Sequence, residues 1–226
     1  MSPEGTAGTR NGPTRTGRFP AVLLVAGALA LVGALVRILH SAPADVRAPA
    51  ATLITLYLIW VALETRISLR TAGEPASEQD RGSEQLYGAA RLATLVAALY
   101  GPLPHGPWQP WMLVPVGLLT AGAALRLLSI RTLGRFYSHR VRTVHDHRIT
   151  DTGPYRVLRH PAYTGMLLAH VGLVTFFLNP VSVALLLGAF LPAVVYRIRT
   201  EETALAQVAG YREFARDRKR LVPFVW

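Results

Sequence analysis

The residues best suited to chemistry lie in two polar blocks of the C-terminal half, residues 153–165 and residues 197–202. The first block reads GPYRVLRHPAYTG and combines arginine, histidine and tyrosine with the helix-breaking residues glycine and proline. It runs directly into an apolar stretch, so we expect a polar loop that leads into a helix. The first backbone N–H groups of a helix lack intrahelical partners and carry the positive end of its dipole. The first block is therefore a candidate anion-binding site.

The second block reads RIRTEE and supplies the opposite charge. Arg197 and Glu201 are four residues apart, so a helix places them on one face as a cation beside an anion. Arg197 could orient a carboxylate through a bidentate pair of hydrogen bonds. The rings of Tyr155 or Tyr163 could face a cationic group of a ligand through cation–π contact. Together the blocks offer partners for a ligand that carries both signs of charge.

The two blocks match the pattern GPYxxxRHPxYxG followed by RIxxEE at every fixed position. In this they resemble the isoprenylcysteine carboxyl methyltransferase (ICMT) family of integral membrane enzymes. The resemblance covers roughly residues 108–223, whereas the first hundred residues resemble the family only as a hydrophobic pattern. It implies a methyl transfer that depends on S-adenosyl-L-methionine (SAM) at the face of a membrane.

The resemblance also implies roles for single residues. The His160–Pro161 turn and the backbone after it would hold the methionine moiety of SAM, Tyr163 would border the cofactor, and Glu201 would meet its polar end. The other residues expected at the cofactor are Tyr155, Arg159, Gly165 and Glu202. Arg197 and Glu201 are the expected catalytic residues, and Arg197 would also contact the acceptor.

Each of these residues has a structural alternative. Arginines beside apolar spans often only set topology, and tyrosines often mark the membrane interface. The alternatives are basic anchors for Arg156 and Arg159, a helix cap for His160, a solvent-facing side chain for Glu202, and interfacial belt positions for Tyr155 and Tyr163.

Several ionisable residues fall inside apolar stretches. Arg91 lies near one end of such a stretch, where we expect its stem to reach the membrane boundary. His170 is seven residues beyond Tyr163 on the same helical face, which makes it a weak candidate for the substrate pocket. The alternative is a neutral histidine that bonds to a neighbouring helix. Arg126 and Glu64 are expected either to reach the membrane boundary or to pair.

One further cluster contains residue types that bind metals. Its spacing fits no metal-binding motif, so we expect no metal site there. The members of this cluster are His139, His145, Asp146, His147 and Asp151. The run from Asp146 to Asp151, just before Gly153, more simply forms a lid over the cofactor.

The composition is that of a membrane protein. Of the 226 residues, 51% are hydrophobic and only 16% are charged, which is too apolar for a soluble domain of this length. The net charge of +11 falls in blocks between apolar spans, so we expect contact with membrane lipids and not with nucleic acid. The absence of cysteine excludes disulfides, thiolate nucleophiles and iron–sulfur clusters.

The apolar runs predict an all-α, polytopic membrane protein of about six transmembrane helices. Three regions follow: a disordered tail over residues 1–18, N-terminal transmembrane helices over residues 19–107, and an ICMT-like methyltransferase region over residues 108–226. The arginine-rich segments alternate with arginine-poor ones, which places both termini and the 131–159 cofactor-binding linker in the cytoplasm. The last span is expected to continue as a helix to Phe214. The predicted spans are residues 19–39, 48–69, 86–103, 108–130, 161–178 and 181–196.

The sequence therefore predicts a SAM-dependent membrane methyltransferase, and the resemblance favours carboxyl O-methylation of a lipophilic or lipidated acceptor. Related enzymes with similar motifs methylate phospholipid amines or thiols, which stay open as alternatives. Sterol-type reductases that use NADPH share an HPxYxG pattern, and a non-enzymatic scaffold that binds lipid head groups is the remaining alternative. The identity of the acceptor and the oligomeric state do not follow from the sequence.

Overall fold

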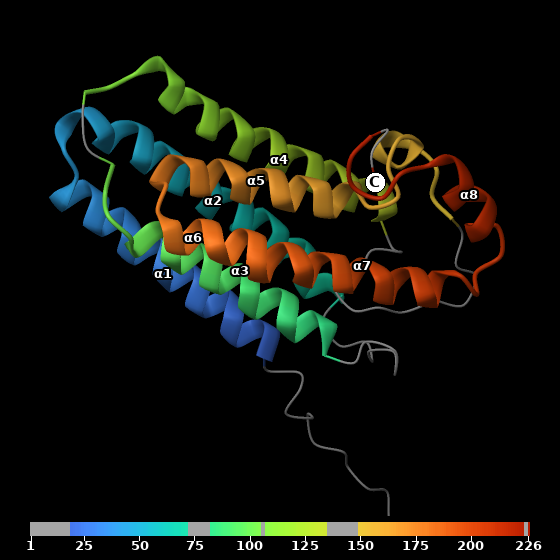
Figure 1. Ribbon diagram of the computed structural model, residues 1–226. Coiled ribbons are helices and arrows are strands. Elements are labelled where there is room, and N and C mark those ends of the chain that lie inside the picture. The colour runs from blue at the N-terminus through green and yellow to red at the C-terminus, as the bar shows by residue number, and fades with distance from the viewer. Residues whose placement is uncertain (1–18, 72–81, 105–106, 135–148, 224–225) are drawn as a thin grey trace, which may run out of the picture.

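The computed structural model describes residues 19–71, 82–104, 107–134, 149–223 and 226. The described residues form helices and no β-strand, which confirms the all-α prediction (Figure 1). The long helices run alternately up and down a bundle, so chain segments far apart in sequence meet at its two ends. The α-helices are α1 (Phe19–Ser41), α2 (Ala44–Thr71), α3 (Ser83–Tyr100), α4 (Leu113–Leu133), α5 (Pro161–Phe177), α6 (Pro180–Leu185), α7 (Leu191–Leu205) and α8 (Tyr211–Asp217).

Four helical stretches of the described chain are long and apolar enough to cross a membrane, namely Ala21–Ser41, Ala44–Arg66, Pro110–Leu133 and Pro180–Leu205. Helix α5 is apolar but shorter, with 17 residues. Helix α3 occupies the predicted third span but begins earlier, at Ser83. The length and composition of these helices indicate an integral membrane protein.

Helices α4 and α5 lie against each other along their length because glycines let their backbones meet. A side chain on Gly165 would collide with the backbone of Gly122 and Arg126 on α4, and a side chain on Gly172 would collide with the backbone of Pro115. Small residues at such interfaces are typical of membrane helices, where close packing and not the hydrophobic effect drives association. This pair fixes the start of α5 relative to α4.

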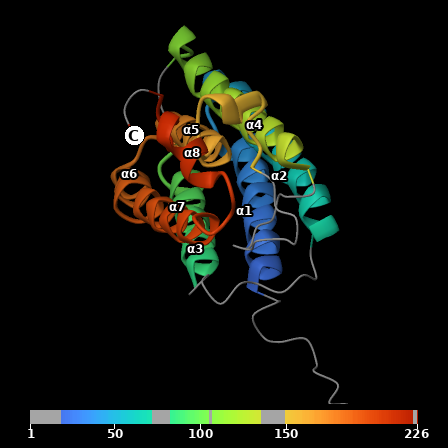
Figure 2. The same ribbon diagram turned by 90° about the vertical axis from the view of Figure 1, so that its right-hand side faces the viewer.

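The last long helix is irregular. Its first part, α6, passes through a π-helical turn, Leu186–Phe190, into α7. The prediction that this helix continues to Phe214 is wrong, because α7 ends at Leu205 and the chain turns before α8. Gly210 makes this turn possible with a φ of 82°, in the left-handed region that other residues rarely adopt. Viewed from its end, the bundle carries α8 over one end of α5 (Figure 2).

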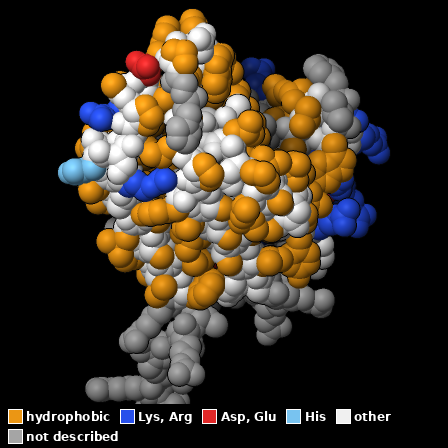
Figure 3. Space-filling view, turned by 60° about the vertical axis from the view of Figure 1, so that its left-hand side comes forward, with side chains coloured by type: hydrophobic (Ala, Val, Ile, Leu, Met, Phe, Trp, Pro, Cys, Tyr) orange, Lys and Arg blue, Asp and Glu red, His pale blue; other side chains and the backbone are white. Residues whose placement is uncertain are grey.

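The outer surface of the bundle is mainly hydrophobic, as a lipid-facing surface should be. The face in Figure 3 carries a few charged groups among many apolar ones, with most of the visible basic side chains toward one edge. Exposed apolar residues of α1 include Val25, Leu29 and Val32. Such exposure would be costly in water but is expected in a bilayer.

Candidate active site

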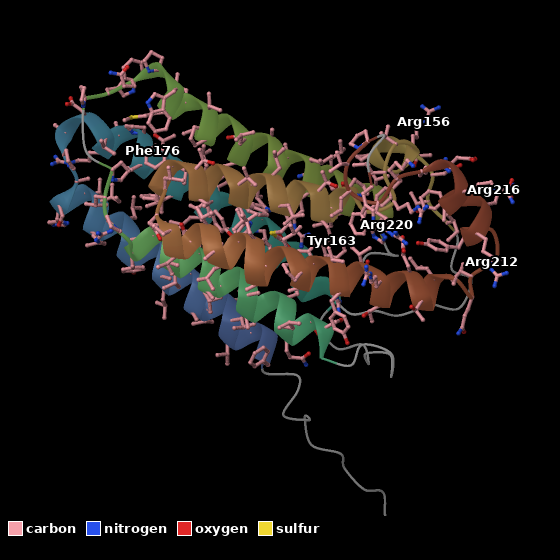
Figure 4. All side chains as sticks on the ribbon, viewed as in Figure 1. Arg156, Tyr163, Phe176, Arg212, Arg216 and Arg220 are labelled. Carbon is pink, nitrogen blue, oxygen red and sulfur yellow. The ribbon has the colours of Figure 1, made fainter. Side chains whose placement is uncertain are left out.

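The two polar blocks of the sequence meet at one end of the bundle. Here the start of α5, the end of α7, the 3-10 turn Gly153–Arg156 and the described part of the C-terminal segment, residues 218–223 and 226, come together. Figure 4 shows Tyr163 and Arg220 toward this end of the bundle and Phe176 at the opposite end. Arg156 points outward, which fits the alternative of a basic anchor.

Glu202 is held by three basic residues. Arg159 Nη1 lies 3.1 Å from Oε1 of Glu202, and Arg220 Nε and Nη2 lie 2.8 and 2.7 Å from Oε2. His160 Nε2 is 3.4 Å from the first oxygen. The alternative of a solvent-facing Glu202 does not hold, since both its oxygens are engaged. This carboxylate joins α7, the loop before α5 and the C-terminal segment.

Glu201 has different surroundings. It accepts a hydrogen bond of 2.6 Å from the hydroxyl of Tyr163, and its other oxygen lies 3.6 Å from His160 Nδ1. Arg197 Nε lies 3.9 Å from Oε1, as the i, i+4 spacing predicted. The Glu201 side chain keeps 22% of its surface exposed, against 13% for Glu202. Of the two carboxylates, Glu201 is the more accessible to a ligand.

His160 lies between the two carboxylates and is charged more readily than an ordinary histidine. Burial by itself would lower the pKa of its imidazole, but hydrogen bonds and electrostatic attraction from Glu201 and Glu202 outweigh burial and raise the pKa above its usual value. The residue also stands at the N-cap of α5, directly before Pro161 at the first helical position. Its side chain makes no capping hydrogen bond and instead bridges the two carboxylates.

The C-terminal segment completes the site, and sequence reasoning missed its role. The backbone N–H groups of Arg159 and His160 donate to the carbonyls of Lys219 and Arg220 at 2.8 and 3.1 Å. Thr164 Oγ1 donates to the carbonyl of Leu221 at 2.8 Å, and Leu221 is buried in the main core. The backbone donors just before α5, which the sequence offered to an anion, are thus taken by this segment. Its apolar composition was the one sequence signal that it folds back.

Arg197 is almost fully buried, with 2% of its surface exposed. Besides its place near Glu201, its Nη1 donates a hydrogen bond of 2.6 Å to Ser83 Oγ at the start of α3. Ser83 lies in the half of the chain that carries no motif, so nothing in the sequence pointed to it. The hydroxyl ties the orientation of the guanidinium to α3.

Two other predicted cofactor residues take no part in the ionic contacts themselves. Tyr155 is buried and packs in a small cluster with Tyr211 and Phe214 of α8, where burial and the nearby Glu201 carboxylate raise its pKa. Gly165 faces α4, where it is a packing residue. For these residues, contact with the cofactor stays a prediction.

The ionisable residues deeper in the bundle are paired. His170 is fully buried, with Nδ1 2.8 Å from the Met166 carbonyl and Nε2 3.0 Å from the Tyr57 hydroxyl on α2. This is the arrangement of a histidine bonded to a neighbouring helix, the alternative to a pocket residue. Arg126 binds Glu64 on α2 through Nε at 3.0 Å and through Nη2, so pairing is the outcome for these two residues.

Of the predicted metal-like cluster, the structure describes only Asp151, which is exposed. The other members, His139, His145, Asp146 and His147, lie outside the described residues, and so does the first half of the predicted lid, residues 146–148.

The groups at this end fit SAM. Glu201 can accept hydrogen bonds from an ammonium, and Arg159, with His160 and its raised pKa beside it, can face a carboxylate. The buried hydroxyl of Tyr211 has no hydrogen-bond partner among the described residues, so a donor is left over for a polar ligand. The set of donors and acceptors therefore suits the amino acid end of the cofactor.

Comparison with known proteins points to the same region. Residues 115–207 match the model of the isoprenylcysteine carboxyl methyltransferase (ICMT) family. Protein-S-isoprenylcysteine O-methyltransferase B of Arabidopsis thaliana is 33% identical over 123 residues, which are 52% of this chain and 62% of that protein. A probable protein-S-isoprenylcysteine O-methyltransferase of Oryza sativa subsp. indica is 34% identical over 124 residues, 51% of this chain and 63% of that protein.

The alignments thus span less than two thirds of the length of these relatives. They cover about half of this chain. The family match includes both polar blocks, residues 153–165 and 197–202. The C-terminal half of this protein is therefore ICMT-like.

Proposed function

We propose that this protein is a SAM-dependent integral membrane methyltransferase that methylates the carboxylate of a lipophilic or lipidated acceptor. The observation that carries the proposal is the junction of the two blocks, in which Glu201 meets Tyr163, His160 and Arg197. The comparisons support the same chemistry, since the similar proteins are named as O-methyltransferases. They do not favour a reductase or a scaffold.

SAM supplies an electrophilic methyl group on a sulfonium. The protein then has to bind the cofactor and the acceptor, orient them and exclude water. The rate of a displacement depends mainly on holding the two reactants in line. Glu201 would bind the ammonium of the cofactor, and His160 and Arg159 would bind its carboxylate. Tyr163 would lie at the border of the cofactor. A carboxylate acceptor is already ionised at neutral pH, so no general base is needed.

The acceptor would reach this site from the membrane. Its lipophilic part would lie between helices in the region of His170, and its carboxylate near Arg197. In this arrangement the protein has six spans and both termini in the cytoplasm. A phospholipid amine or a thiol remains the second choice of acceptor, but either would first have to lose a proton.

The test is methyl transfer by the purified protein in detergent. Labelled SAM is supplied with N-acetyl-S-farnesylcysteine as the probe acid, and the base-labile methyl ester is counted. We expect ester formation by the wild type and loss of at least about 90% of it in Glu201→Gln, since the cofactor loses an ionic partner. Label in a base-stable product would instead indicate an amine or thiol acceptor. No transfer to this probe or to a lipid extract would contradict the proposal.

A further inference from the structure

A hydroxyl without a partner lies just inside the proposed active site. Tyr87 on α3 meets the ring of Tyr163 edge-on, with centroids 5.8 Å apart, and the ring of Phe190 at 5.7 Å. Its hydroxyl oxygen is buried and has no hydrogen-bond partner among the described residues. Burying an unpaired hydroxyl costs free energy, so native proteins usually supply a partner. A ligand group is one such partner.

The charges that act on this hydroxyl are mainly positive. They come from Arg91, Arg126 and Arg197, with Glu64 as the one carboxylate among the strongest. Glu64 is already bonded to Arg126. Arg91 has no carboxylate partner in the part of the chain that the structure describes. A positive charge inside a membrane protein is costly unless an anion balances it.

Arg91 points into the bundle, one turn beyond Tyr87 on α3. The expectation that its side chain would reach the membrane boundary is wrong. Its Nη2 donates one hydrogen bond of 3.3 Å to the Tyr57 hydroxyl, and its Cζ lies 5.2 Å from the centroid of the Trp60 ring. The Nε1–H of Trp60 is buried and also lacks a partner in the described structure. The groups that lack partners here can all donate a hydrogen bond, so they call for an acceptor.

The surroundings connect this place with the proposed cofactor end. Phe190, the last residue of the π-helical turn, packs on Tyr87 and also on His170, whose ring centroid is 4.7 Å away. Turns of this kind are rare and frequent at functional sites. The rings of Tyr163, Tyr87, Phe190 and His170 thus form a continuous series from the cofactor end into the bundle. Their faces suit the lipophilic part of an acceptor.

We propose that Tyr87 and Arg91 complete, together with Arg197, the binding site for the carboxylate of the acceptor, with the indole N–H of Trp60 as a further donor. This inference rests on the proposed function and assigns the residues that would hold the reacting carboxylate. One carboxylate oxygen forms the new bond to the methyl carbon, and the methyl–sulfur bond breaks with its electron pair left on sulfur. No proton moves, and the acceptor loses its negative charge. The ester then no longer balances Arg91, which favours its release.

The test compares binding of N-acetyl-S-farnesylcysteine with binding of its methyl ester, measured by thermal stabilisation of the purified protein without cofactor. The wild type should bind the acid about tenfold more tightly than the ester or better, since a hydrogen bond to a charged group is the stronger kind. Tyr87→Phe should lower acid affinity about tenfold and leave ester affinity unchanged. Arg91→Met should remove the preference for the acid.

Tyr87→Phe also has a diagnostic stability. Because its hydroxyl makes no bond within the described structure, the variant should melt at the same temperature as the wild type or higher. The matched control is Tyr100→Phe on the same helix, whose hydroxyl donates to the Ala30 carbonyl at 3.0 Å. It should keep the acid preference of the wild type.

Equal binding of acid and ester by the wild type, or an unchanged preference in Tyr87→Phe, would overturn the inference, and water would then fill the site. If Arg91→Met does not fold, the comparison of acid and ester binding between the wild type and Tyr87→Phe still decides the outcome. Because no cofactor is present, an acid preference without methyl transfer would contradict the proposed function and leave this inference standing.

Discussion

At the scale of residues, the two adjacent glutamates have separate tasks. Glu202 is bound by Arg159, Arg220 and His160 and joins three chain segments. Glu201 is more exposed and faces Tyr163 and Arg197. A paired EE motif alone does not distinguish a structural carboxylate from a ligand-binding one. The distinction follows from which basic residues reach each side chain.

We predict that Glu202→Gln is the more destabilising of the two amide substitutions. It leaves two arginines beside a neutral side chain, and losing hydrogen bonds between charged groups costs about 1–3 kcal/mol. Thermal unfolding in detergent should show a lower midpoint for Glu202→Gln than for Glu201→Gln. Glu201→Gln should instead lose SAM affinity. The opposite order would mean that the tasks are reversed.

The raised pKa of His160 predicts a pH dependence. A group with a raised pKa stabilises the folded state fully below its unfolded pKa, about 6.5, and loses this effect as the pH rises through the folded value. The bridge between the two carboxylates should therefore weaken at alkaline pH. The unfolding midpoint of the wild type should fall over this window, and the fall should be smaller in His160→Gln. A flat wild-type profile would count against the bridge.

Ser83 is predicted to position Arg197 without touching a ligand. Ser83→Ala removes the acceptor of the 2.6 Å hydrogen bond, so the acceptor KM should rise several-fold while SAM affinity stays the same. Ser83→Thr keeps the hydroxyl and should restore activity. Thr94→Ala is the control, because Thr94 is buried on the same helix and its hydroxyl donates only to the Ala90 carbonyl within that helix. If Ser83→Ala and Thr94→Ala behave alike, the positioning role is wrong.

At the scale of elements, the packing of α4 on α5 holds the start of α5 in place. Gly165 has no room for a side chain because the backbone of Gly122 and Arg126 is too close. Gly165→Val should therefore separate the helices and cost about 1–3 kcal/mol or more through overpacking. Gly188→Ala is the control, since a methyl group there meets nothing. Urea unfolding of both variants would check this, and equal stability would contradict the packing.

The sequence predicted the helices well and their ends less well. Apolar runs of membrane length specify where helices form, and the motifs specify that residues 153–165 and 197–202 matter. Ser83, Tyr87 and Arg220 could not be predicted as site residues, because their roles come from tertiary contacts between segments that carry no pattern. The break after Leu205 was missed because its apolar spacing continues through Phe214, and only Gly210 signalled a turn.

At the scale of the whole molecule, the up-and-down bundle brings both polar blocks and the start of α3 to one end. Exposed basic residues such as Arg212 and Arg216 lie at this end too, as expected for a cytoplasmic face (Figure 4). The chain has no cysteine, so single cysteines can report its orientation. In intact cells, Arg216→Cys should resist a membrane-impermeant maleimide and Asp45→Cys should react. The reverse pattern would place the site outside.

The most direct test of the central claim is equilibrium binding of SAM by the wild type and by Glu201→Gln, with NADPH as the competing cofactor. The proposed site predicts that SAM binds the wild type, that the substitution weakens this binding at least about tenfold, and that NADPH does not compete. Binding of NADPH in place of SAM, or SAM binding that ignores Glu201, would contradict the assignment of this end of the bundle as a methyltransferase site.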